Sequence, residues 1–80
     1  MRLDKYLKVS RIIKRRTVAN DACVNSHVSV NGKIVKPSYD LKIGDLVEVS
    51  FGEKTLKFKV LSLEEHTQKA KAAEMYEILQ

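Results

Sequence analysis

The apolar residues of this chain change their spacing at Val28, from a helical period in the N-terminal segment to a period of two. In the first segment, Leu3, Tyr6 and Leu7 fall on one side of a helix predicted over residues 2–9. A helix this short does not hold alone in water, so its apolar side has to pack on another element. Because 80 residues allow one domain with a modest core, the change of period predicts a small α+β fold.

A second helix is predicted over residues 16–25, after a connection over residues 10–15. Asn25 and Ser26 end this helix, and Asn25 is the residue expected to take a left-handed conformation. We expect Cys23 to be a small buried apolar residue and not a reactive thiol. The inner face of the helix consists of Ala19, Ala22 and Cys23.

Strand patterns follow the second helix. Asn31-Gly32 between two short alternating runs is the strongest short-range signal for a β-hairpin. Two further strands are predicted over residues 47–51 and 56–61, with a turn over residues 52–54. We expect Phe51 and Phe58 to point inward, and the outward lysines Lys57 and Lys59 to mark an edge strand.

Helical spacing returns from Thr67, which predicts a C-terminal helix whose apolar stripe packs back on the sheet. We therefore expect one domain over residues 1–80, with a motif core over 1–50, a strand hairpin extension over 51–63 and a helical tail over 67–80. Its expected architecture is two N-terminal helices packed on a short, mainly antiparallel twisted sheet, followed by the C-terminal helix. The stripe of that helix consists of Ala72, Met75, Tyr76 and Leu79.

Positive charge is concentrated at the N-terminus. Residues 1–16 hold seven basic side chains and one acidic one, a net charge of +6, whereas residues 17–80 sum to −1. A patch of this kind favours a polyanion, either nucleic acid or an anionic membrane surface, although a charged segment can also be only a solvated face. The first helix separates its charged and apolar sides, which favours a binding surface. The seven basic residues are Arg2, Lys5, Lys8, Arg11, Lys14, Arg15 and Arg16.

Sequence motifs for catalysis and for metal binding are absent. There is no Gly-rich phosphate loop, no His-Glu-x-x-His motif and no paired-cysteine spacing, and the single cysteine excludes an internal disulfide. The chain also lacks a signal-peptide pattern and an apolar run long enough to cross a bilayer. We therefore expect a cytoplasmic protein that is not an enzyme and uses neither a cofactor nor a metal.

Several spaced motifs occur together in an order that resembles the S-four-type RNA-binding domain, also called the alpha-L motif. The resemblance covers about residues 1–50. Within that superfamily the chain is most similar to the small stand-alone branch that includes bacterial heat-shock protein fifteen and the RqcP family of ribosome quality control factors. The RqcP family is the closer match, because the chain ends near position 80 without a long basic extension. The matching residues are Arg2-Leu3-Asp4-Lys5-Tyr6-Leu7, Arg11, Lys14, Arg16, Val28-x-Val30-Asn31-Gly32, Lys36-Pro37-Ser38, Phe51-Gly52 and Ala72-Ala73-Glu74-Met75-Tyr76.

This resemblance implies a monomeric factor that binds large-subunit rRNA and peptidyl-tRNA on obstructed large ribosomal subunits. It implies support for the tail-adding factor RqcH, which extends the stalled peptide with alanine. Arg2 and Arg16 match the family's RNA-contacting arginines, and Asp4 matches an acid expected to orient a neighbouring arginine. The resemblance further implies that the remaining basic residues extend the surface and that the hairpin backbone approaches the RNA; these are Lys5, Lys8, Arg11, Lys14 and Arg15, with Asn31, Gly32 and Lys33 in the hairpin.

Two positions depart from the family pattern. Arg15 stands where relatives often have a Ser or Thr helix cap, which weakens that helix end by about 1 kcal/mol unless RNA fills it. Ser26 replaces a usual glycine, so strain is expected at the corner between helix and strand.

Other functions stay open at this point. One is a detached RNA-binding accessory module of an RNA-modifying enzyme, and another is a general rRNA-binding recycling or heat-shock factor. Binding to an anionic membrane or to DNA is a third, although the apolar side of the first helix is narrow for membrane insertion.

Overall fold

Two helices precede the first strand, as the change from helical spacing to a period of two predicts. The computed structural model describes residues 1–79 of the chain. The α+β class is confirmed, with two helices before the first strand and a short helix near the C-terminus. The elements are α1 (Leu3–Val9), α2 (Arg16–Val24), β1 (Val28–Val30), β2 (Lys33–Ile34), β3 (Leu46–Phe51), β4 (Lys54–Val60), α3 (Lys69–Ala72), the 3-10 helix η1 (Ala73–Met75) and β5 (Tyr76–Leu79).

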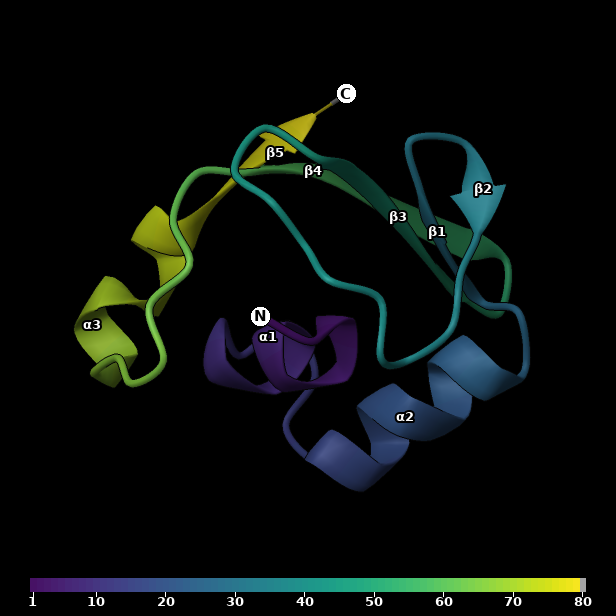
Figure 1. The fold of residues 1–80 in the computed structure, drawn as a ribbon, viewed down its shortest axis with the longest axis horizontal. Coiled ribbons are helices and arrows are strands. Elements are labelled where there is room, and N and C mark those ends of the chain that lie inside the picture. The colour runs from purple at the N-terminus through teal and green to yellow at the C-terminus, as the bar shows by residue number, and fades with distance from the viewer. Residues whose placement is uncertain (80) are drawn as a thin grey trace.

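The strands form one antiparallel sheet, which is the layer opposite the helices. Its strand order is β2-β1-β3-β4-β5, and every neighbouring pair is antiparallel. The sheet curves over α1, while α2 lies beside α1 on the same side and α3 lies near the end of the sheet that carries β5 (Figure 1). All the helices therefore cover one side of the sheet.

The core lies between α1 and the inner face of the sheet. Leu3, Tyr6 and Leu7 are fully buried, as the apolar side of the first helix predicts. Phe58 of β4 stacks on Tyr6, with ring centroids 6.2 Å apart. Tyr76 packs edge-on against the other side of Phe58, at 5.6 Å. Docking against the sheet thus stabilises a seven-residue helix that is too short to be stable by itself.

The β1–β2 hairpin is confirmed. Asn31 and Gly32 both have positive φ angles, 52° and 84°. Two consecutive positive φ angles define the turn type whose twist matches that of the flanking strands. Ser29 then pairs with Ile34, and Val30 with Lys33.

The C-terminal tail differs from the prediction in its last residues. Helical structure ends at Met75, and Tyr76–Leu79 form β5. This strand pairs with β4, so β4 is an internal strand and not an edge. The helical stripe was wrong at Tyr76 and Leu79 because the free edge of β4 offers these residues backbone hydrogen bonds that the local pattern does not reveal. Gln80, the last residue of the predicted tail, lies outside the described residues.

Two local predictions are also corrected. Phe51 is 45% exposed and not internal, because it lies at the end of β3 beside the turn into β4. The left-handed residue after α2 is Ser26, with φ 62°, whereas Asn25 has φ −88°. The strain expected at Ser26 is therefore present, and Asn25 caps the helix without it.

None of the helices in residues 1–79 has both the length and the apolar character that crossing a membrane requires.

The carbonyl oxygen of Met75 connects three segments. It accepts hydrogen bonds from the Tyr6 hydroxyl at 2.7 Å and from the backbone N–H groups of Leu61 and Ser62 at 2.8 and 3.2 Å. Burial raises the pKa of Tyr6 above its usual range, and the nearby Tyr76 raises it further, so the hydroxyl stays a donor. These bonds fasten the start of β5 to α1 and to the end of β4.

Replacing Tyr6 by Phe removes one of these donors and keeps the packing of the ring. We expect the free energy of unfolding to fall by about 1 kcal/mol, because the Met75 carbonyl keeps its two other donors. Urea unfolding followed by circular dichroism measures the change. Tyr39→Phe is the matched control, since Tyr39 is only half-buried, and an equal loss in both variants would contradict a role for the Tyr6 hydrogen bond.

Candidate nucleic-acid interface

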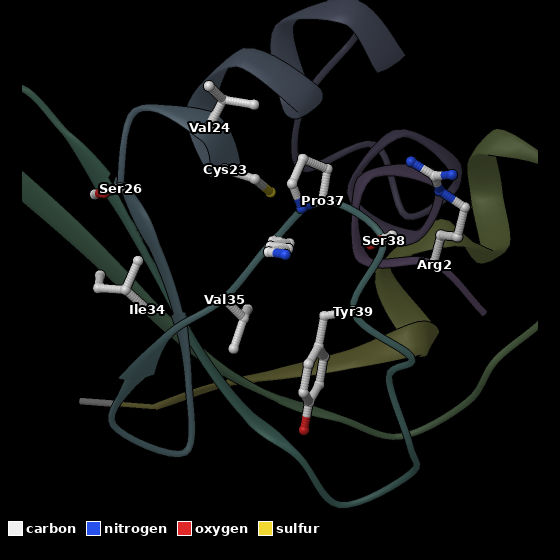
Figure 2. Close-up of a pocket in the computed structure, with 10 residues that line it drawn as sticks. Arg2, Cys23, Val24, Ser26, Ile34, Val35, Pro37, Ser38 and Tyr39 are labelled. Atoms are coloured by element: carbon white, nitrogen blue, oxygen red, sulfur yellow. The ribbon is translucent and has the colours of Figure 1, made fainter.

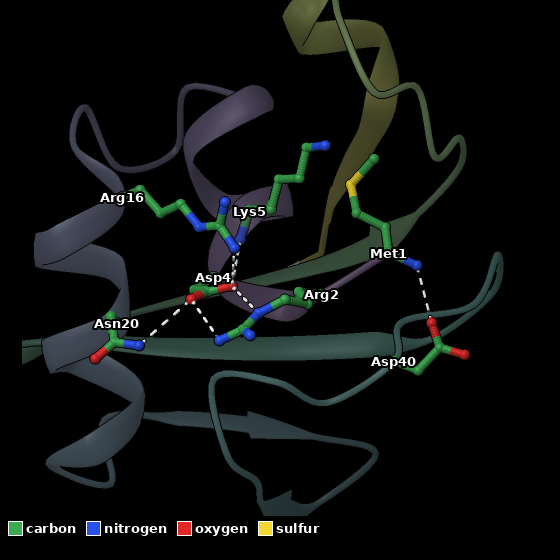
Figure 3. A network of polar contacts seen from close by, with 7 residues as sticks. All are labelled: Met1, Arg2, Asp4, Lys5, Arg16, Asn20 and Asp40. Carbon is green, nitrogen blue, oxygen red and sulfur yellow. Dashed lines mark hydrogen bonds and ion pairs between the residues drawn. The ribbon is translucent and has the colours of Figure 1, made fainter.

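A buried carboxylate, Asp4, lies where α1 and α2 meet (Figure 3). Its residue is only 2% exposed, and both of its oxygens accept hydrogen bonds. Arg2 donates from Nε to Oδ1 at 3.1 Å and from Nη2 to Oδ2 at 3.2 Å. The backbone N–H of Lys5 donates to Oδ1 at 2.8 Å. Asp4 therefore holds the guanidinium group of Arg2 by two parallel bonds, a geometry that fixes its orientation.

The second helix supplies the other partners of this carboxylate. Arg16 Nη2 lies 3.6 Å from Oδ1 of Asp4, and Asn20 Nδ2 donates to Oδ2 at 3.4 Å. Arg16 and Asn20 are four residues apart, so both side chains fall on the face of α2 that meets α1. Asp4 thus ties the two helices together and brings Arg2 and Arg16, which are far apart in the sequence, onto one anion.

The charges in this cluster favour an ionised carboxylate with net positive charge around it. Burial by itself raises the pKa of Asp4, but hydrogen bonds from Arg2, Asn20 and the Lys5 backbone, with the charge of Arg16, together lower the pKa below its ordinary value. The side chains of Arg2 and Arg16 are 49% and 48% exposed. Each arginine therefore has N–H groups left for a ligand outside the protein.

Segment 37–41 fixes the start of α1. The N–H groups of Leu3 and Asp4 donate to the carbonyls of Tyr39 and Pro37 at 2.9 and 3.1 Å. Arg2 forms a backbone bridge with Asp40, whose carboxylate accepts a hydrogen bond from the amino group of Met1 (Figure 3). Backbone carbonyls thus replace a side-chain cap at this helix end, and they place Arg2 beside segment 37–39.

The N-terminus of α2 has no side-chain cap and, in contrast to that of α1, no hydrogen bonds to the backbone of segment 37–41. Its cap residue, Arg15, makes no side-chain capping hydrogen bond, as its departure from the family pattern predicts. Lys14, Arg15 and Arg16 are all exposed there. Free N–H groups and the positive end of the helix dipole add to these three charges, so this end of α2 favours a phosphate.

A second group of basic residues extends from Lys5, in the first turn of α1, to Arg11 beyond the C-terminal end of the helix. Lys5 pairs with the carboxylate of Glu65, and Lys8 and Arg11 line a small hollow together with Glu65 and His66. Arg11 has a φ of 64°, in the position after a helix where glycine is usual. An arginine in this conformation costs about 1 kcal/mol of backbone strain relative to glycine.

The hairpin residues are placed apart from these groups. The turn that holds Asn31, Gly32 and Lys33 lies at the opposite side of the molecule from α1 and α2 (Figure 1). The Asn31 side chain donates to Asp45 at 3.1 Å and accepts from the Leu46 N–H at 3.0 Å. The structure therefore brings Arg2 and Arg16 together on Asp4, pairs Lys5 with Glu65, and places Lys8 and Arg11 along one hollow, but it does not join the hairpin turn to them.

Not every residue of this interface was identified from the sequence. Asn20 escaped notice as a ligand of Asp4, although its spacing of four from Arg16 was the available signal. Lys36, Ser38 and Tyr39 line a groove next to Arg2, and only the Lys36-Pro37-Ser38 motif pointed toward them. Cys23 is buried as predicted; burial, with a further contribution from the charge of Asp4, raises the pKa of its thiol to about 11.

Nowhere in residues 1–79 do three or more His, Cys, Asp or Glu side chains gather in a way that could hold a metal ion.

Comparison with known proteins defines the class to which this fold and this site belong. Residues 1–47 match the S4 domain. The whole fold superposes on a solved structure described as the trimeric structure of heat shock protein 15 from Vibrio cholerae, with a TM-score of 0.92 at 25% identity, covering 99% of this chain and 81% of that one. The protein is thus a small S4-domain protein with the architecture of heat shock protein 15.

Curated relatives narrow the class further. The chain is 57% identical to the RQC P-site tRNA stabilizing factor of Streptococcus pneumoniae, over 99% of this chain and 90% of the relative. It is 49% identical to the factor of the same name from Bacillus subtilis, over 99% and 92%. The chain belongs to the family of RQC P-site tRNA stabilizing factors within the S4-domain proteins.

Substituting Asp4 by Asn tests the role of its charge. At neutral pH we expect the free energy of unfolding to fall by about 2 kcal/mol, because two guanidinium groups lose their shared anion. The folded-state pKa of Asp4 lies below its ordinary 3.8, so its contribution is present in full above that value and is lost as the pH falls through the folded-state pKa. The difference between the two proteins should therefore be constant above about pH 5 and shrink below about pH 4.

Urea unfolding of both proteins over a pH series measures this difference. Glu53→Gln is the control, since Glu53 is an exposed carboxylate in the turn between β3 and β4. A difference for Asp4→Asn that stays the same in acid would refute the role of the charge.

Proposed function

We propose that this protein is an RNA-binding factor without enzymatic activity that acts on obstructed large ribosomal subunits, where it binds rRNA and the peptidyl-tRNA. In this role it supports the addition of alanine to the C-terminus of the stalled chain. The supporting observation from the molecule itself is the pair of half-exposed arginines, Arg2 and Arg16, held on the buried carboxylate of Asp4. The names of the relatives, RQC P-site tRNA stabilizing factor, support the tRNA and the quality control pathway.

The physics of RNA recognition favours folded RNA for this surface. A-form RNA presents phosphates and 2′-hydroxyls across a wide, shallow minor groove and hides its base edges. Arginines that are fixed before binding lose little entropy on contact, and their forked N–H groups bind phosphates at two points. Lys14, Arg15 and the uncapped N-terminus of α2 extend the same surface toward further phosphates.

The second group of basic residues, from Lys5 to Arg11, extends this interface along α1. We assign Lys5, Lys8 and Arg11 to contacts with a second segment of RNA. Glu65 competes for Lys5, so RNA has to displace an exposed ion pair, which costs little in water. The hairpin turn with Asn31, Gly32 and Lys33 stays a predicted contact, for RNA that reaches the other side of the molecule.

We further propose that the tail-adding factor RqcH acts on the same subunit and that this protein binds there as one copy, in the cytoplasm. Light scattering of the free protein distinguishes a monomer from the trimer described for heat shock protein 15 of Vibrio cholerae. A trimer in solution would overturn the single-copy arrangement.

Arg2→Gln and Arg16→Gln should each weaken binding to large subunits. Each variant loses about one phosphate contact, so we expect the slope of log affinity against log salt concentration to decrease in magnitude by about one. Co-sedimentation with purified large subunits over a salt series measures both quantities. Lys54→Gln, which removes an exposed cation at the start of β4, is the control that should leave binding unchanged. Unchanged binding by both arginine variants would contradict the proposal.

The double variant Arg2→Gln/Arg16→Gln should also shorten the alanine tails. In a reaction that contains obstructed large subunits, RqcH and alanyl-tRNA, weaker retention of the peptidyl-tRNA should allow fewer additions for each chain. Tail length on a denaturing gel is the readout, with Lys54→Gln again as the control. Tails of normal length from a variant that no longer binds the subunit would separate RNA binding from tailing and refute the proposed support.

A further inference from the structure

An open groove begins at Arg2 and runs toward the C-terminal end of α2 (Figure 2). Its volume is about 700 Å³, within the range of sites for small molecules. The walls come from the end of α2, from β2 and from segment 35–39. Of the basic residues to which we assign RNA contacts above, Arg2 alone lines it, so this groove is distinct from the rest of that surface.

The groove is lined by apolar side chains together with two basic ones, Arg2 and Lys36. Val24 and Ile34 line one side and are 65% and 58% exposed, and Figure 2 shows both on the same side of the groove. Val35 and the ring of Tyr39 line the other part of the groove (Figure 2). Exposed branched side chains beside an aromatic ring give an apolar ligand area to cover.

The charges at the groove are all positive. Arg2 and Lys36 both line it, and no acidic residue does so. A cationic ligand is therefore disfavoured, while a ligand that carries an apolar flat part and an anionic part is complementary to the groove. The arginine at the groove is also one of the two that Asp4 orients.

We propose that this groove accepts one unpaired nucleobase of the bound RNA, whose phosphate lies on Arg2 or Lys36. The inference rests on the proposed RNA-binding function and adds to it a preference for RNA with a bulged or flipped nucleotide. A paired base cannot enter, because its faces are stacked and its edge is bonded within the duplex. An unpaired base can stack on Tyr39 and cover Val24 and Ile34, and such stacking accepts any base.

Two RNA stem-loops test this proposal. One has a fully paired stem and the other has the same stem with a single unpaired uridine. The wild-type protein should bind the bulged stem about tenfold more tightly than the paired stem, the gain that stacking of one base provides.

Variants of the exposed groove residues identify the source of the gain. In Val24→Thr/Ile34→Asn the preference for the bulged stem should fall to within about twofold, while affinity for the paired stem is kept. The matched control is Val18→Thr/Ile43→Asn, which changes two residues that are equally exposed and do not line the groove. The control should keep the full preference.

A photo-crosslink locates the base independently of affinity. With 4-thiouridine at the bulge, the crosslink should fall within residues 34–39 of the wild-type protein, and a crosslink elsewhere would overturn the proposal. Equal binding of the two stems by the wild-type protein would overturn the groove site and leave the proposed function standing.

The remaining outcomes separate the other possibilities. If neither stem nor the large subunit is bound, the proposed function itself fails, and the groove site fails with it. If the groove variants keep the bulge preference but lose co-sedimentation with large subunits, the groove binds a protein segment, which overturns the assignment to a nucleobase.

Discussion

Asp4, in the first turn of α1, joins this helix to α2 through its contacts with Arg16 and Asn20. The helices are seven and nine residues long, and neither is stable without tertiary contacts. An apolar interface alone would allow them to slide and rotate, whereas a carboxylate that accepts hydrogen bonds from Arg2 and Asn20 and pairs with the charge of Arg16 restricts their arrangement. The ordered spacing of the basic side chains therefore depends on one buried acid, which is retained in a segment that is otherwise cationic.

The sheet and the C-terminal segment provide the platform on which this junction is built. Phe58 and Tyr6 stack in the core, and the Met75 carbonyl fastens the tail to α1 through the Tyr6 hydroxyl. A domain of this size has a small apolar core, so each buried polar bond between segments contributes a substantial share of its stability. The tail thus packs on the buried side of α1, and the side of α1 that carries the basic residues stays free to bind a ligand.

Backbone strain lies next to the surfaces to which we assign RNA contacts. Arg11 follows the C-cap of α1 and Ser26 follows that of α2, and both hold left-handed conformations that favour glycine. Ser26 lines the apolar groove, and Arg11 lines the hollow at the other end of α1. Both corners therefore store backbone strain, on the order of 1 kcal/mol each, beside a surface hollow.

The sequence by itself determined the bounds of α1 and α2 to within a residue, the Asn31-Gly32 turn and the apolar side of α1, because these depend on periods and dihedral preferences within a few residues. It also determined the concentration of charge in residues 1–16, and the order of motifs pointed to the family. Only the tertiary structure decided that Tyr76–Leu79 add a strand to β4, that Arg2 and Arg16 share Asp4, and that Asn20 joins them. The physical reason is that a strand edge, a buried ion pair and a groove each need partners from distant parts of the chain, and their energies arise only when packing removes those groups from water.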